Sequence, residues 1–154
     1  MPTATLTSTA FARSPRAVHA GVNSQSIVFS SGTVTASGAT TVFLTKLPIG
    51  ATVLDVFGEH TINADTCPVD IGILNQQVSS GGTVTARFSS LSAFISGATK
   101  GSRTRAAVVN NLPYLVTAAD TDTNRYNILV ATATPGTQAT NLILKYTVLY
   151  TLDA

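Results

Sequence analysis

The sequence predicts an all-β domain, a sandwich or a barrel, preceded by an extended N-terminal arm. From residue 26 onward, short runs of Thr, Val, Ile and Phe are separated by Gly, Ser, Asn and Pro, which is the pattern of many short strands joined by turns. No segment keeps an apolar period of 3.6 residues over ten positions, and Gly97 interrupts the one weak helix candidate, residues 91–100. The length of 154 residues fits one domain that builds its core without disulfides or metals.

Strands are expected where β-branched and aromatic residues lie between turn residues. The strand that begins at Thr40 ends at Pro48, because proline has no N–H to donate to a neighbouring strand. Two serine-containing segments, Ser30-Ser31-Gly32 and Ser89-Ser90, are expected to be turns between separate strands. The full set of expected strands is 26–29, 33–36, 40–47, 52–57, 67–74, 83–88, 91–95, 106–109, 114–116, 126–133 and 141–151.

The segment 141–151 has the clearest strand pattern. Its alternate positions are apolar and share one face: Leu142, Leu144, Tyr146, Val148 and Tyr150. On the opposite face, Ile143 and Leu149 are apolar among polar neighbours. A strand that is apolar on both faces is either central in a sandwich or pressed against a neighbouring subunit.

Residues 1–25 are expected to form the arm, and residues 26–154 the β-sandwich. The first segment is rich in Thr and Ala and has neither a helical nor an alternating apolar period with which to pack. It nevertheless contains Phe11, Arg13 and Arg16. We expect Phe11 to be an apolar anchor on a neighbouring molecule and the two arginines to face acidic groups there.

The scarcity of charge predicts that much of the surface is covered by other subunits. Only 10% of the residues are charged, against about 25% in an average soluble domain, and 25 Thr and 14 Ser take their place. So few charges leave apolar patches that favour association. The alternative is that the hydroxyl groups alone keep the chain soluble.

Composition also bears on the partners. A formal net charge of +2 is too small to indicate nucleic-acid binding. No run of 18 apolar residues indicates a membrane span. The N-terminal sequence lacks the basic and apolar regions of a secretory signal, so we expect synthesis in the cytoplasm without a signal peptide.

No catalytic, cofactor or metal site is expected. His19 and His60 lack a metal-binding spacing and are expected to be surface histidines. Cys67 lies inside an apolar run and is expected to be a small buried hydrophobe.

Acidic residues gather in two places. Asp55, Glu59, Asp65 and Asp70 follow one another closely enough to crowd one end of a sheet. In the second place, Asp120-Thr121-Asp122, the alternation resembles that of ion ligands, although aspartate is also an ordinary turn residue. A surface ion site near Asp120 and Asp122 is therefore left open.

The main basic cluster is formed by Lys100, Arg103 and Arg105. No aromatic residues alternate with these cations, so base stacking on nucleic acid is not indicated. The cluster is interpreted either as a solvated loop or as a contact with an acidic neighbouring protein.

Several segments together resemble small virion proteins of tailed bacteriophages. These proteins enter one strand after Pro-x-Gly-Ala and continue with Val-Leu-Asp-Val, as in Pro48-Ile49-Gly50-Ala51-Thr52-Val53-Leu54-Asp55-Val56. A second strand with Asp-x-Gly follows, as in Cys67-Pro68-Val69-Asp70-Ile71-Gly72, and segments 112–117 and 144–151 are similar to the closing half of the same proteins. The resemblance covers about residues 25–151.

The proteins that it resembles are head decoration (cement) or auxiliary capsid proteins. The resemblance implies a single antiparallel, jelly-roll-like β-sandwich that binds the major capsid protein on the outside of an icosahedral shell. It also implies a homo-oligomer, most often a trimer, and it supplies no catalytic residues.

Two other functions stay open at this point. One is another virion component, such as a head-fibre base, a neck or tail protein, or a receptor-binding module. The other is a carbohydrate-binding or hydrolytic β-sandwich. A receptor-binding module would expose aromatic side chains, for which Phe94, Tyr114 and Tyr126 are available.

Overall fold

The structure is a computed structural model that describes residues 4–8, 21–34, 39–63, 66–78, 84–106, 112–116, 126–136 and 139–152. All the regular elements in these ranges are strands. Their bounds are β1 Ala4–Thr7, β2 Gly21–Val34, β3 Thr40–Pro48, β4 Ala51–Asn63, β5 Val69–Val78, β6 Val84–Ala98, β7 Thr104–Arg105, β8 Tyr114–Leu115, β9 Tyr126–Ala133 and β10 Ala139–Leu152.

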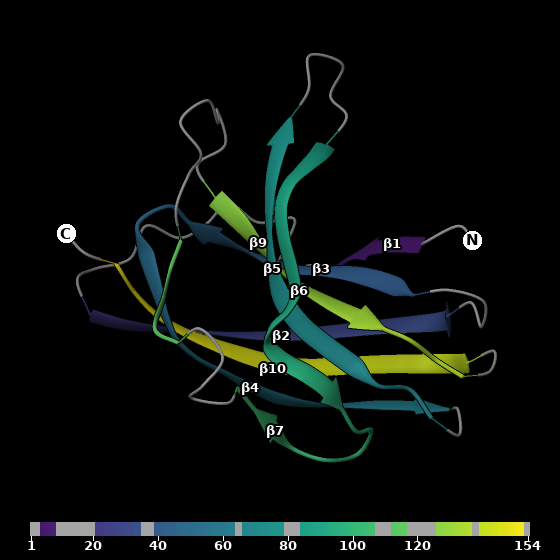
Figure 1. Ribbon diagram of the computed structural model, residues 1–154. Helices are drawn as coiled ribbons and strands as arrows, with labels where there is room; N and C mark the ends of the chain where they lie inside the picture. The colour runs from purple at the N-terminus through teal and green to yellow at the C-terminus, as the bar shows by residue number, and fades with distance from the viewer. Residues whose placement is uncertain are drawn as a thin grey trace.

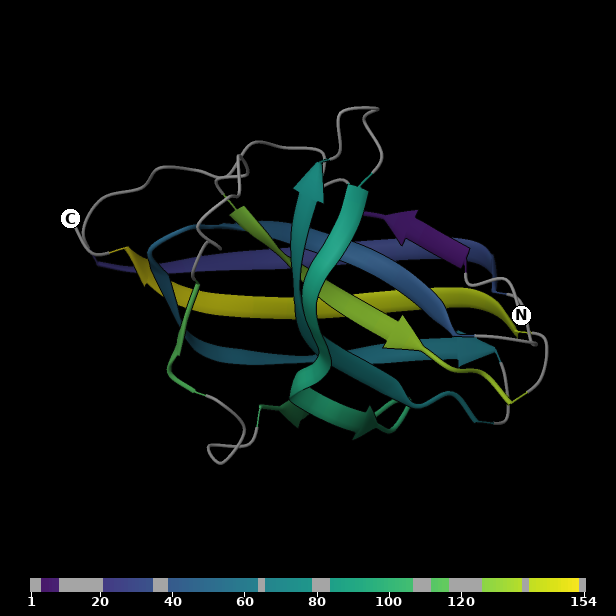
Figure 2. The same ribbon diagram turned by 45° about the horizontal axis from the view of Figure 1, so that its top comes forward.

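The strands form two sheets with the connectivity of a jelly roll (Figure 1). Sheet A has the order β1-β3-β9-β5-β6, and sheet B has the order β2-β10-β4-β7, with β8 also paired to β4. When β1 and β8 are set aside, each sheet has four strands. In chain order, β2 to β5 alternate between the sheets, β5 and β6 are neighbours in sheet A, and β7, β9 and β10 alternate again, as in two Greek keys. Figure 2 shows β5, β6 and β9 of sheet A crossing over the long strands of sheet B. The predicted all-β, jelly-roll-like sandwich is confirmed.

One strand pair departs from the antiparallel arrangement. β1 lies within the segment expected to be an arm, and it pairs in parallel with β3 from Ala4 opposite Thr40 to Thr7 opposite Phe43. Ser8 extends this attachment, because its N–H donates to the Phe43 carbonyl at 2.9 Å and its hydroxyl donates to the Leu44 carbonyl. The other arm residues singled out from the sequence, Phe11, Arg13 and Arg16, lie outside the described residues.

The two serine-containing segments are not turns, and this prediction was wrong. Residues 30–32 lie inside β2, which keeps one register with β10 from Gly21 to Val34. Ser89 and Ser90 lie inside β6, opposite Leu74 and Ile73 of β5. Because a neighbouring strand accepts and donates hydrogen bonds along the whole segment, sheet pairing overrides the weak local preference of serine for turns.

The core lies between the sheets and is built from alternate residues of their strands. β10 is central in sheet B, and its even-numbered residues from Leu142 to Tyr150 are buried. In sheet A, β9 is buried on both faces: Leu129 and Ala131 join the main core, whereas Ile128 and Val130 form a smaller cluster with Leu74. The burial of alternate residues in 141–151 is thus explained by the central position of β10, whereas Ile143 and Leu149 lie on the outer face of sheet B and are partly exposed.

A contact between Gly58, Tyr146 and His60 fixes how β4 and β10 lie against each other. Gly58 is the register partner of Tyr146, and a Cβ atom at Gly58 would lie 2.2 Å from the Lys145 carbonyl oxygen and 2.6 Å from Tyr146 Cδ1. The Tyr146 ring therefore occupies the space that a side chain at position 58 would need. Its hydroxyl lies 3.5 Å from His60 Nδ1.

His60 is buried, so its prediction as a surface histidine was wrong. The side chain points inward from β4 and is only 1% exposed, and Nε2 donates to the Cys67 carbonyl at 2.8 Å. Since a carbonyl only accepts, Nε2 carries the proton in the neutral ring. Burial lowers the pKa of His60, although the hydrogen bond to Cys67 acts in the opposite direction. Cys67 is buried as well, which confirms its prediction as a small buried hydrophobe, and this burial raises the pKa of its thiol.

The lowered pKa of His60 predicts that the fold loses stability in mild acid. As the pH falls below about 6.5, the unfolded chain binds a proton on His60 that the folded chain still excludes. Stability contributed by the neutral ring is therefore present above this pH and is lost below it. Urea unfolding at about pH 7.5 and at about pH 5.5 should show this loss in the unmodified protein.

The matched variant for this measurement is His60→Gln, whose amide can donate to Cys67 but does not titrate. It should be less stable at both pH values and should show a smaller difference between them. His19 is present in both proteins, so any contribution from it cancels in the comparison. An equal pH dependence in the two proteins would contradict the assignment to His60.

The close approach at Gly58 predicts that Gly58→Ala is strongly destabilising. The new methyl group meets the backbone of β10, which cannot move without breaking its ladder, so we expect a loss of about 3 kcal/mol or more in the free energy of unfolding. Thr61→Ala is the control, because Thr61 is exposed on the same strand. Equal stabilities of the two variants in urea would show that β10 moves aside at this point, and would contradict the prediction.

Candidate functional site

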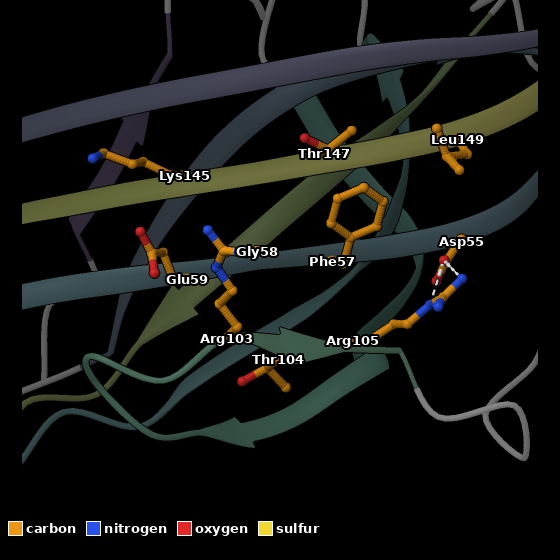
Figure 3. A pocket seen from close by; sticks show the side chains of 10 residues that line it. All are labelled: Asp55, Phe57, Gly58, Glu59, Arg103, Thr104, Arg105, Lys145, Thr147 and Leu149. Atoms are coloured by element: carbon orange, nitrogen blue, oxygen red, sulfur yellow. Dashed lines mark hydrogen bonds and ion pairs between the residues drawn. The ribbon is translucent and has the colours of Figure 1, made fainter.

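A groove lies on the outer face of sheet B. It has a volume of about 610 Å³ and lies over β4 and β10, with the β6–β7 connection and β7 along one side (Figure 3). Its lining residues are Asp55, Phe57, Gly58, Glu59, Arg103, Thr104, Arg105, Lys145, Thr147 and Leu149.

The strand period explains why these side chains share one surface. Residues two apart on a strand point to the same face, so Asp55, Phe57 and Glu59 of β4 line up on the outside of the sheet. The β10 residues opposite them in register are Leu149, Thr147 and Lys145, respectively. From position 55 to position 59 the groove extends over about 13 Å, at roughly 3.3 Å per residue.

A β-bulge at Leu54 sets which residues of β4 face outward. The register with β10 shifts between Leu149, opposite Asp55, and Tyr150, opposite Val53. Leu54 is thereby left without a partner, and the inward alternation resumes at Val56, which is buried. Without this extra residue, Asp55 and Phe57 would face the core and the groove would lose its lining.

An ion pair closes one end of the groove. Arg105 Nε donates to Asp55 Oδ2 at 2.5 Å, and the second guanidinium nitrogen, Nη2, contacts the same oxygen. The Asp55 side chain is only 8% exposed, whereas that of Arg105 is 74% exposed. The hydrogen bond and the charge of Asp55 raise the pKa of Arg105, which stays cationic in any case.

The other end of the groove carries an excess of positive charge. Lys145 and Glu59 are register partners on neighbouring strands, and Arg103 reaches toward Gly58 and Glu59 from the β6–β7 connection (Figure 3). Among the described residues, no ion pair joins Arg103 to an acidic group. Phe57, between the two ends, and Leu149, opposite Asp55, form an apolar floor, and Phe57 is 38% exposed.

The structure divides the basic cluster that the sequence singled out. Arg103 and Arg105 line the groove, whereas Lys100 lines a separate pocket of about 300 Å³ beside Cys67 and Pro68. Sequence reasoning missed Phe57, the main apolar surface of the groove. The signal that could have identified it is its spacing of two from Asp55, once the bulge at Leu54 is allowed for.

The acidic residues do not gather at one end of a sheet as expected. Asp55 lies on sheet B, whereas Asp70 lies on β5 of sheet A, where its carboxylate accepts from the Gly97 N–H at 2.7 Å. Asp65, Asp120 and Asp122 lie outside the described residues. In the ranges that the structure describes, no group of three His, Cys, Asp or Glu side chains is arranged to hold a metal ion.

The aromatic residues available to a receptor-binding surface are not all on the surface. Phe94 is fully buried and contacts Tyr114 edge-on, with ring centroids 5.7 Å apart. Burial raises the pKa of Tyr114, and the side chain of Tyr126 lies outside the description. As for membranes, the described part of the chain contains no helix with the length and apolar character of a span.

Two solved phage capsid structures contain chains that are similar to this one. A chain in the capsid of Ralstonia phage GP4 is 17% identical, with a TM-score of 0.70, and the match covers 98% of this chain and 99% of that one. A chain in the capsid asymmetric unit of cyanophage Pam1 is 20% identical, with a TM-score of 0.59, and the match covers 92% and 94% of the two chains. No protein-family model matches the sequence, and no curated protein does. The likenesses show that the chain shares its jelly-roll fold, over almost its whole length, with chains of two phage capsids.

Proposed function

We propose that the protein is a structural component of a phage virion that binds the outside of the capsid as an oligomer and stabilises the shell of the major capsid protein. The observation that carries this proposal is the end-to-end match with chains of two phage capsids. Because each match covers nearly all of both chains, the likeness extends to the whole polypeptide and not to one embedded domain. The role requires no catalysis and no cofactor.

The outer face of sheet B supports a role in assembly. Its exposed apolar side chains include Val22 at 65%, Val28 at 60%, and Leu54 and Phe57 at 38% each. Ile143 and Leu149 are partly exposed on the same face. Val28 is the register partner of Lys145, two residues from Ile143, so Val28 and Ile143 are diagonal neighbours on this face. Neighbouring exposed apolar side chains are typical of an interaction surface.

We assign different parts of this face to different partners. Val22, Val28 and Ile143, on β2 and β10, are proposed to contact other copies of the chain, most simply in a homotrimer. Phe57, Arg103 and Arg105, on the β4 and β7 side, are proposed to face the shell. Lys100 and the arm residues Phe11, Arg13 and Arg16 are further proposed contacts with the shell.

Binding to a shell can be tested directly. The purified protein is mixed with undecorated shells of the matching phage and the shells are pelleted by centrifugation. We expect the protein to sediment with the shells and to raise the temperature at which they open, because a ligand stabilises the state that it binds. Protein that stays in the supernatant at saturating concentration would contradict the proposed function.

Self-association has its own test. Light scattering should give a mass of three times the 15.9 kDa of one chain. Val28→Asp should lower this mass, because a charge in a buried interface without a partner is costly. Ser96→Asp, at an exposed position of β6 in sheet A, is the control and should leave the mass unchanged. A 15.9 kDa monomer in the unmodified protein would rule out the oligomer.

A further inference from the structure

The groove on sheet B combines an apolar floor with a charge imbalance at one end. Phe57, between the two ends, and Leu149, opposite Asp55, form the floor. At the end formed by β7 and the bulge, Asp55 and Arg105 neutralise each other. At the opposite end, Arg103 and Lys145 are two cations beside a single anion, Glu59 (Figure 3). The groove therefore carries a net charge of about +1, located at the Glu59 end.

Arg103 is the group that is best placed to take an incoming anion. It is exposed, and no described acidic group pairs with it. A guanidinium offers two parallel N–H donors that match the two oxygens of a carboxylate. A carboxylate next to an apolar side chain is thus the chemical complement of this groove.

The strand geometry fixes the spacing between these two groups. Phe57 and Glu59 are two residues apart on one face of β4, so the apolar floor and the cationic end are about 7 Å apart. A partner segment that lies extended along the groove also presents every second side chain to the sheet. The full groove, about 13 Å long, holds roughly four residues of such a segment.

We propose that this groove binds an extended segment of a neighbouring capsid protein in which an apolar residue and an acidic residue stand two positions apart. The apolar side chain lies on Phe57 and Leu149, and the acidic side chain binds Arg103. The location of this segment in the shell rests on the proposed function; the chemistry of the groove does not.

Two pairs of variants test the proposal on undecorated shells. Arg103→Glu should weaken binding about tenfold, because it replaces attraction by repulsion at the carboxylate. Lys46→Glu makes the same change of charge on β3 of sheet A, away from the groove and from the proposed contacts, and should alter binding less than about twofold. Phe57→Ser should also weaken binding about tenfold, whereas Leu115→Ser, at a 52% exposed apolar residue on β8, should not.

A second measurement needs no shells. In an NMR titration, the peptide acetyl-Leu-Thr-Asp-Thr-amide should shift the amide signals of residues 57–59, and acetyl-Leu-Thr-Asn-Thr-amide should not. Arg103→Glu should abolish the shifts caused by the first peptide. Raising the salt concentration should reduce them, because Arg103 is exposed and its charge is screened.

The outcomes separate this proposal from the proposed function. If the unmodified protein does not sediment with shells, the function is wrong, and the peptides still decide the chemistry of the groove. If it sediments but Arg103→Glu and Phe57→Ser bind as tightly as their controls, the groove proposal is overturned. Equal shifts with the two peptides, or none with either, also overturn it. A lower oligomer mass for Phe57→Ser would make the groove a contact between copies and would overturn it as well.

Discussion

Strand β10 lies between β2 and β4 and is hydrogen-bonded to both along nearly its whole length. Its inward residues supply the middle of the core from Leu142 to Tyr150, and its outward residues supply one wall of the groove. Removing it would leave β2 and β4 as two separated strands with unpaired edges and no common hydrophobic face. The sandwich and its outer surface therefore depend on the position of this one strand between β2 and β4.

The register of β10 against β4 links the core to the groove. A slip of one residue would exchange the inner and outer faces of β10, so that Lys145 and Thr147 would enter the core. Gly58 opposes such a slip, because only a glycine leaves room for the Tyr146 ring at this point. The bulge at Leu54 then reverses the alternation of β4 within a few residues and turns Asp55 outward. Packing inside the sandwich thus decides which side chains a partner meets.

The sequence predicted the all-β class and most strands, because β-branched runs and proline boundaries are local signals. It located β3 and β9 almost to the residue, and the apolar residues on both faces of β10 left two interpretations open, a central strand or a contact with a neighbouring subunit. It did not predict that β2 and β6 are continuous, because strand pairing overrides the local turn preference of serine. It misplaced His60 for a similar reason: its burial depends on Tyr146 and Cys67, which only the fold brings near. Of the proposed contacts in the groove, only Arg103 and Arg105 were identified. The apolar periodicity of the sequence does not show the bulge at Leu54 that turns Phe57 to the same face.

The place of β10 in the middle of sheet B also constrains the order of events during synthesis. Ser26 and Thr147 are side by side in the sheet although 121 residues separate them along the chain, and pairings of this separation form slowly. While residues 139–152 are still inside the ribosome, β2 and β4 have no strand to join them, so the nascent chain cannot complete sheet B. At about 5–20 residues per second, this state persists for several seconds or longer. Polypeptides released before this point therefore lack the completed groove as well as the core.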